Sequence, residues 1–287
     1  HIRSSHLEEA IRLGLHSGFG GDFLRIGAIK IFADGALGPR TAAMFDPYEG
    51  EAGSRGIVVT EKEELIQLTS KASLSGLNCA IHAIGDRAVH DVLDAYESIR
   101  RIEQGQGIST NTRRHRIEHV QLIHPDDAVR LGKLGIIASM QPTHATSDMY
   151  MADKNWGERA AYGYNWRLLL DHGATLAFGS DAPVESVNPF LGIHAAVTRR
   201  RTDGTPGPDG WRPENNGRLT VQEALHAYTV GAAFAAGMED RLGRLVPGYL
   251  ADILILNQDM FTVDPMDIAA IKPEAVMIGG KWVVNNL

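Results

Sequence analysis

A lysine, two histidines and an aspartate each follow a short apolar run, and all four side chains are able to bind a metal. They are Lys30, His82, His119 and Asp181. The apolar runs are predicted strands, and side chains at the strand ends of a β/α barrel converge on one point, where such barrels hold catalytic metals. Imidazole and carboxylate groups suit divalent metals, and catalytic zinc keeps one coordination position open for water. The pattern therefore favours a metal-dependent enzyme.

Three of these residues also have simpler interpretations. A single buried histidine is more often a satisfied core residue than a ligand. Asp181 precedes Pro183, and an aspartate at such a position can cap a turn. Because His82 and His119 follow neighbouring predicted strands at matching positions, we favour the metal site for both.

Lys30 needs an explanation, since a lysine within a strand is costly to bury unless it is paired or neutralised. Carboxylation by carbon dioxide would make it an anionic ligand bridging two metals, whereas Asp34 or Glu118 would pair with it as an ion pair. The spacing does not choose between these. Glu118 precedes His119 directly and is expected to point to the opposite face if the strand geometry persists.

Substrate contacts are expected from residues near the same strand ends. Arg40 is suited to a substrate carboxylate through two hydrogen bonds, and His144 follows the fourth predicted strand. We assign Arg40, His144 and Asp34 to substrate binding. A plain loop histidine is an equally good interpretation of His144.

Predicted strands and helices alternate along most of the chain. Short apolar runs predict strands, and apolar positions three or four residues apart predict helices. The predicted strands are residues 28–32, 77–81, 114–118, 136–140 and 175–178, and the predicted helices are 60–74, 87–103, 125–134, 166–172, 189–200 and 220–236. This alternation indicates an α/β fold with a parallel sheet and right-handed crossovers. Residues 1–27 are expected to form a polar helix and a Gly-rich loop, and 33–57 and 143–164 long loops.

Local signals refine these boundaries. Thr60-Glu-Lys-Glu63 and Thr220-Val-Gln-Glu223 match the capping box that begins a helix. Near the C-terminus, residues 251–256, 275–278 and 281–284 are predicted strands, with Gly279-Gly280 as a hairpin turn. We therefore predict a barrel part over residues 1–244 and a small β domain over residues 245–287.

Composition excludes several other classes of protein. The net charge of −7, from 28 basic and 35 acidic residues, argues against a nucleic-acid or anionic-membrane binder. No apolar run approaches the roughly 20 residues that span a bilayer. Cys79 is the single cysteine, within an apolar strand, which fits a core residue of a cytoplasmic protein.

The chain resembles the YtcJ-like branch of the amidohydrolase superfamily from about residue 28 to its end. The similar motifs include Ile29-Lys-Ile-Phe-Ala-Asp-Gly35, His82-Ala-Ile-Gly-Asp-Arg-Ala88, Arg116-Ile-Glu-His-Val120, Phe178-Gly-Ser-Asp-Ala-Pro183 and Gly243-Arg-Leu-Val-Pro-Gly-Tyr-Leu-Ala-Asp252. Each motif is weak alone, but their order along the chain is specific.

The resemblance implies a (β/α)8 barrel, with strands four to eight present, beside part of a small β-sandwich. It implies one or two divalent metals, usually zinc, and hydrolysis of amide or other C–N bonds in a small molecule. Lys30, either unmodified or carboxylated, would follow barrel strand four, and His82 and His119 would follow strands five and six. Asp181 would follow strand eight, bind metal and take the proton from the attacking water.

One departure from the family pattern limits this expectation. Family members carry a His-x-His pair on the first barrel strand, and no two histidines here are two positions apart. We therefore expect either a fragment, or a chain completed by a second polypeptide. An inactive fragment that folds or oligomerises, and a metal-independent enzyme using Asp181 and a histidine, stay open as alternatives. An exposed sheet edge favours association, so we expect a homodimer.

Overall fold

The structure, a computed structural model that describes residues 1–51 and 53–287, contains a parallel sheet. Six strands lie in chain order, β1 to β6. Their bounds are β1 Ile2–Arg3, β2 Ala28–Phe32, β3 Asn78–Ala83, β4 Arg116–His119, β5 Ile137–Met140 and β6 Thr175–Phe178. The pairs from β1 to β5 are parallel, as the alternation of strands and helices predicted. The chain divides into two compact units, residues 1–140 with 149–176 and residues 141–148 with 177–287.

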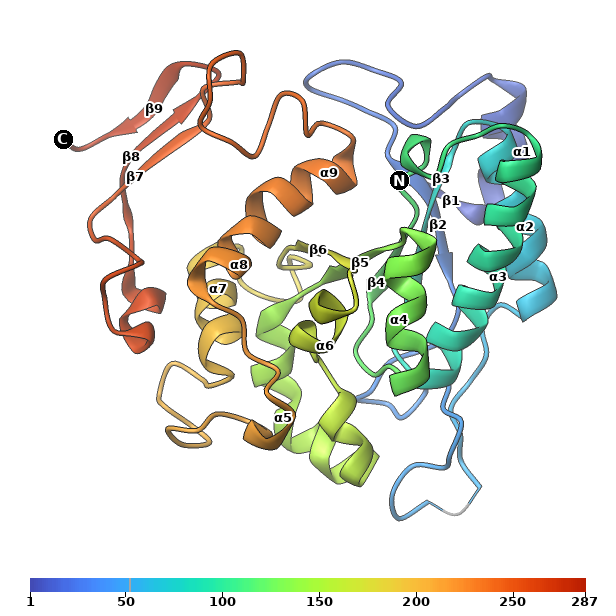
Figure 1. Ribbon diagram of the computed structural model, residues 1–287, viewed down its shortest axis with the longest axis horizontal. Coiled ribbons are helices and arrows are strands. Elements are labelled where there is room, and N and C mark those ends of the chain that lie inside the picture. The colour runs from blue at the N-terminus through green and yellow to red at the C-terminus, as the bar shows by residue number, and fades with distance from the viewer. Residues whose placement is uncertain (52) are drawn as a thin grey trace. The chain divides into compact units, whose positions relative to one another are not determined.

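Helices follow most of the strands. They are α1 Leu7–Arg12, α2 Lys62–Leu74, α3 Asp86–Gly105, α4 Pro125–Leu134, α5 Pro142–Trp156, α6 Trp166–Asp171, α7 Pro189–Thr198, α8 Val221–His226 and α9 Ala232–Ala236. In the first unit, α1, α2, α3 and α4 pack in chain order (Figure 1). α4 has the predicted bounds, because Pro125 suits a first turn and Gly135, at φ 60°, adopts the left-handed conformation that ends the helix.

The two faces of the sheet differ in chemistry, because side chains alternate along each strand. One face is apolar and buried, with Ile29 and Ile31 from β2, Ile81 from β3 and Ile117 from β4. The opposite face carries Lys30, and the parallel register places His82 beside Glu118 on it. Lys30, His82 and Glu118, from three neighbouring strands, therefore share one face of the sheet.

Two predictions about the chain's organisation were wrong. Residues 1–27 contain a strand, β1, which pairs with β2 and makes the sheet six strands rather than five. Residues 143–164 are largely helical rather than a loop, with α5 followed by a 3₁₀ helix, Gly157–Tyr162. Four buried apolar residues of α5 repeat at helical spacing, namely Ala145, Met149, Ala152 and Trp156, but the polar residues between them obscured the pattern.

The loop after β2 and one of the two capping boxes are as predicted. The described residues of 33–57 form no helix, and Ala52 lies outside the described residues. The box at Thr220 is present, with both reciprocal hydrogen bonds to Glu223. The box at Thr60 is absent, because its hydroxyl donates instead to the Phe32 carbonyl at 2.7 Å.

The C-terminal residues form a separate antiparallel sheet in the second unit. Its strands, in order, are β7 Ile253–Leu256, β8 Pro273–Ile278 and β9 Lys281–Asn285. Gly279 and Gly280 both have positive φ, which a two-residue hairpin turn of this kind requires. Among the helices of the described residues, none has the length and apolar character needed to cross a bilayer.

Candidate metal and catalytic site

The two predicted histidine ligands lie together at the ends of β3 and β4. Their ring centroids are 4.7 Å apart, with the ring planes at 73°. His119 has φ 80° and Val120 φ 46°, conformations that cost energy for residues with a side chain and that cluster at functional sites. The matching strand positions predicted that the two side chains would meet, and their rings do; that they bind a metal stays a prediction.

The hydrogen bond of His82 fixes which nitrogen carries its proton. Nε2 lies 2.7 Å from the carbonyl oxygen of Gly35, and a carbonyl oxygen only accepts, so Nε2 is the donor. The lone pair of the neutral ring is then on Nδ1. Metal-binding histidines commonly donate their other N–H to a carbonyl in this way. This geometry fits a metal ligand.

Glu118 shares its face of the sheet with His82, its register partner on β3. We expected Glu118 and His119 to point to opposite faces, on the condition that both residues keep the geometry of a strand. Strand β4 ends at His119, whose positive φ accompanies the contact of its ring with that of His82. Burial raises the pKa of Glu118, but the Arg116 charge, hydrogen bonds from Ser139 and Arg116, and the Lys30 charge lower it below its usual range.

Phe32, an aromatic residue that the sequence did not point to, connects Lys30 to the two histidines. Its Nζ lies 5.0 Å from the centroid of the Phe32 ring, and that ring lies 5.1 Å from the ring of His82. Phe32 is two residues from Lys30 in β2, so the two-residue period of a strand was the signal that indicated a shared face. Of the two ion-pair partners considered for Lys30, Glu118 is the one whose pKa the lysine charge lowers.

Asp34 fixes the start of the long loop against the turn after β3. One carboxylate oxygen accepts the backbone N–H groups of Ala43 and Gly85 at 2.9 and 2.8 Å, and the other accepts that of Ile84 at 3.0 Å. Burial raises the pKa of Asp34 to about 7 even though these three donors lower it. His82 Nε2 lies 3.5 Å from the second oxygen. Asp34 thus holds in place the loop whose Gly35 carbonyl accepts the hydrogen bond of His82. A contact between Asp34 and substrate stays a prediction.

Arg40, the other predicted substrate residue of the first unit, also lies in this loop. It has φ 56°, pairs with Glu51, and donates through Nε to Asn155 at 3.1 Å. A substrate carboxylate would have to displace Glu51, so substrate binding by Arg40 also stays a prediction.

Asp181 and His144 belong to the second unit. Asp181 follows β6 with φ 56°, and its backbone oxygen, rather than its carboxylate, accepts the N–H of Val184. His144 is a buried residue in the first turn of α5. Within the described residues, no group of three or more His, Cys, Asp or Glu is placed so that it could hold a metal ion. The structure therefore brings two imidazoles and a lysine together, and two imidazoles alone make an incomplete ligand set.

Comparison with known proteins gives the family. The model of the amidohydrolase family matches residues 2–284. YtcJ of Bacillus subtilis is 35% identical over 93% of this chain and 48% of its own length. The N-substituted formamide deformylase of Arthrobacter pascens is 29% identical over 86% of this chain and 42% of its own.

A solved structure agrees in fold. An uncharacterized metal-dependent hydrolase from Pyrococcus horikoshii superposes with a TM-score of 0.79 and 34% identity, over 92% of this chain and 51% of that one. This confirms the barrel-type α/β fold. The chain spans about half the length of the relatives it matches. From its matched residues, its motifs and its fold, the chain belongs to the amidohydrolase family, in the YtcJ-like branch.

Proposed function

We propose that this chain is a metal-dependent hydrolase that cleaves amide or other non-peptide C–N bonds in small molecules. The observation that carries the proposal is the pairing of His82 and His119, 4.7 Å apart between ring centroids at neighbouring strand ends. The similarity to a formamide deformylase supports this class of bond.

In this proposal His82 and His119 hold a divalent metal, zinc by the chemistry of the ligands. Lys30, carboxylated by carbon dioxide, and Asp181 are the further ligands. When bound, the metal supplies Lewis acidity, which lowers the pKa of water and polarises a carbonyl. Asp181 takes the proton of the attacking water and passes it to the leaving amine, since a carboxylate at this position is able to act first as base and then as acid.

The substrate contacts follow from the same geometry. Arg40 would bind a carboxylate of the substrate after exchanging Glu51 for it, and the guanidinium fork suits such two-point recognition. His144 and Asp34 are proposed as further substrate contacts.

A second candidate is a non-catalytic protein of amidohydrolase lineage. The absence of a three-ligand His, Cys, Asp or Glu cluster within the described part of the chain favours it. A metal-independent acid–base enzyme using Asp181 is a third, and insensitivity to chelators would distinguish it.

The experiment is hydrolysis of N-benzylformamide by the pure chain, followed as amine release. The proposal predicts activity that Asp181→Asn abolishes, that a chelator removes and that zinc restores. Asp209→Asn, in the same unit but in the loop before Trp211, is the control and should leave the rate unchanged. No activity in zinc-supplemented protein would favour the non-catalytic candidate.

We further propose a cytoplasmic homodimer. Cys79 is a free, buried thiol, which fits a reducing compartment. Light scattering after size exclusion would test the dimer, and a monomer mass near 31.2 kDa would contradict it.

A further inference from the structure

A pocket of about 440 Å³ lies in the first unit, and Lys30, His82 and His119 are not among its lining residues. It is formed by the first turns of α3 and α4, the loop residues Phe45 and Asp46, and the 3₁₀ helix Gly157–Tyr162. Its volume is in the range of small-molecule sites, which are mostly apolar with a few placed polar groups.

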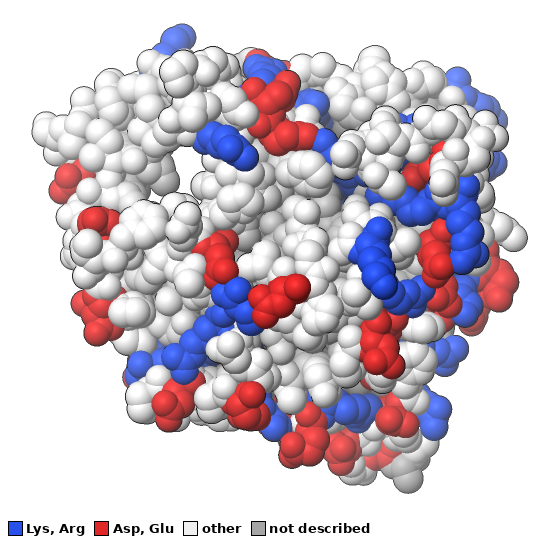
Figure 2. Space-filling view, viewed as in Figure 1, with Lys and Arg blue, Asp and Glu red and all other residues white. Residues whose placement is uncertain are grey.

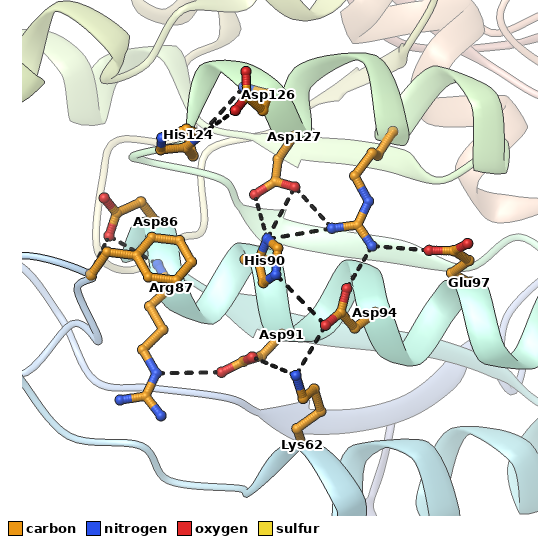
Figure 3. Close-up of polar contacts among 12 residues, drawn as sticks. Lys62, Asp86, Arg87, His90, Asp91, Asp94, Glu97, His124, Asp126 and Asp127 are labelled. Atoms are coloured by element: carbon orange, nitrogen blue, oxygen red, sulfur yellow. Dashed lines mark hydrogen bonds and ion pairs between the residues drawn. The ribbon is translucent and has the colours of Figure 1, made fainter.

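Asp86 provides a buried carboxylate to this pocket. The residue is 6% exposed, and its Oδ1 accepts the backbone N–H groups of Phe45 at 3.0 Å and Arg87 at 2.9 Å. Figure 3 shows both bonds on one oxygen, with the other directed away from them. No described residue donates to Oδ2. Burial raises the pKa of Asp86, and the two backbone donors and the charges of Arg159 and His124 oppose this rise. Oδ2 is therefore an acceptor available to a ligand.

Aromatic side chains border the same pocket. The Phe45 ring meets His90 at a centroid distance of 5.3 Å and His124 at 6.1 Å, both nearly edge to face. Tyr162 also lines the pocket, as do Leu122 and Ile123. Aromatic faces attract cations, and apolar side chains accommodate the body of an organic ligand.

The charges of the pocket favour a cation. Four aspartates line the pocket. The charge of Asp127 is neutralised by an ion pair with Arg130, whose Nη1 lies 2.8 Å from Oδ1 of Asp127. Asp46, Asp86 and Asp126 then face one guanidinium, that of Arg159, which leaves a net charge of −2 with histidines counted as neutral. The N-termini of α3 and α4 add roughly half a positive charge each, which reduces but does not cancel this excess.

An anionic ligand would find few donors here. The Nε, Nη1 and Nη2 atoms of Arg159 already donate to the backbone carbonyls of Trp156, Asp46 and Pro47. Elsewhere on α3, Asp94 pairs with Lys62 of α2 at 3.0 Å and Glu97 with Arg101 at 2.6 Å, and Figure 2 shows basic and acidic side chains intermixed on the face it draws. The lining of the pocket thus favours a cation over an anion.

We propose that this pocket binds a small organic cation, a primary ammonium on an aromatic or apolar body, with the ammonium at Asp86 Oδ2 and the body against Phe45. The ammonium would donate to the carboxylate as a charge-assisted hydrogen bond, and the ring of Phe45 would stabilise the same charge. This site is independent of the proposed hydrolysis and needs no metal.

The test is titration of the 287-residue chain with 2-phenylethylammonium by calorimetry. We expect saturable binding that weakens by about tenfold or more in Asp86→Asn, which loses the charge-assisted bond. Asparagine keeps Oδ1 as the acceptor for Phe45 and Arg87, so the variant should fold. Asp91→Asn, on the same helix but outside the pocket lining, is the matched control and should bind as the wild type does.

A neutral ligand separates charge recognition from apolar burial. 2-Phenylethanol should bind about tenfold or more weakly than the ammonium. Equal binding of the two ligands, unchanged binding in Asp86→Asn, or no saturable binding of the ammonium would each overturn the proposal. If Asp86→Asn fails to fold, Phe45→Leu decides, since it keeps the carboxylate and should still weaken ammonium binding several-fold; an unchanged affinity would overturn the proposal.

Discussion

Arg100 and Arg101 are neighbours on α3, and replacing each by alanine is expected to destabilise the fold to a very different extent. Arg100 is buried and donates to Glu103 at 2.7 Å, and to the carbonyls of Leu134 and Gly135 at the end of α4, at 2.9 and 3.2 Å. Arg101 pairs with Glu97 at 2.6 Å, but its side chain is 73% exposed. The pair of substitutions thus compares a buried and an exposed ion pair on one helix.

The buried hydrogen bonds around Glu103 determine how much stability Arg100→Ala should remove. Glu103 also accepts from Ser73 and from His115 Nε2, the latter at 2.9 Å. Burial alone would raise the pKa of Glu103, but its partners lower it to about 2. The difference from the ordinary 4.5 corresponds to about 3 kcal/mol for the whole network. Removing one partner of a buried pair typically costs about 3–5 kcal/mol, whereas an exposed pair contributes below about 1 kcal/mol.

The assay is urea unfolding followed by far-UV circular dichroism, with native-state exchange of the Cys79 amide as a local probe. His115 Nδ1 accepts this amide at 3.0 Å, so the network holds β3, the strand that carries His82. We expect Arg100→Ala to lower the free energy of unfolding by about 3–5 kcal/mol and Arg101→Ala by about 0.5 kcal/mol or less. Equal effects of the two substitutions would refute the reasoning.

Two other predictions concern the same unit. Gly85→Ala should lower the free energy of unfolding by about 3 kcal/mol, because the added Cβ would lie 2.0 Å from the Ala43 carbonyl oxygen and would break the Asp34 contacts. Urea unfolding would measure this loss, and a value below about 1 kcal/mol would contradict the prediction. Burial lowers the pKa of His115 below 6.5 in spite of the Glu103 hydrogen bond. The unfolded chain therefore binds more protons between the folded pKa and 6.5, so the free energy of unfolding should fall as the pH drops through this window. His115→Gln should remove this part of the pH dependence, and an unchanged pH profile in the variant would rule out His115 as its source.

Sequence patterns predicted elements whose signals are local. α4 follows from a proline at its start and a glycine at its end, and the hairpin of β8 and β9 follows from two adjacent glycines. The strand β1 could not be predicted, because two residues show no periodicity and gain their structure by pairing with β2. Thr60 shows why a motif alone is insufficient: its hydroxyl has a tertiary partner, the Phe32 carbonyl.

The candidate site shows the same limit. The positions of His82 and His119 after neighbouring strands predicted that they would meet. The positive φ of His119 was not predictable, because no residue type near it demands that conformation, and it accompanies the ring contact with His82. The place of Phe32 between Lys30 and His82 depends on side-chain contacts that the alternation of the strand permits but does not specify.

The most direct test of the account is the metal content per chain, by elemental analysis of protein purified without chelator and incubated with zinc. We predict at least one zinc ion per chain, lost in His82→Ala and in His119→Ala and retained in the control His172→Ala, whose histidine is exposed on the first unit. A zinc content near zero in the wild-type chain, or one that neither site variant changes, would contradict the claim that these two histidines form part of a metal site.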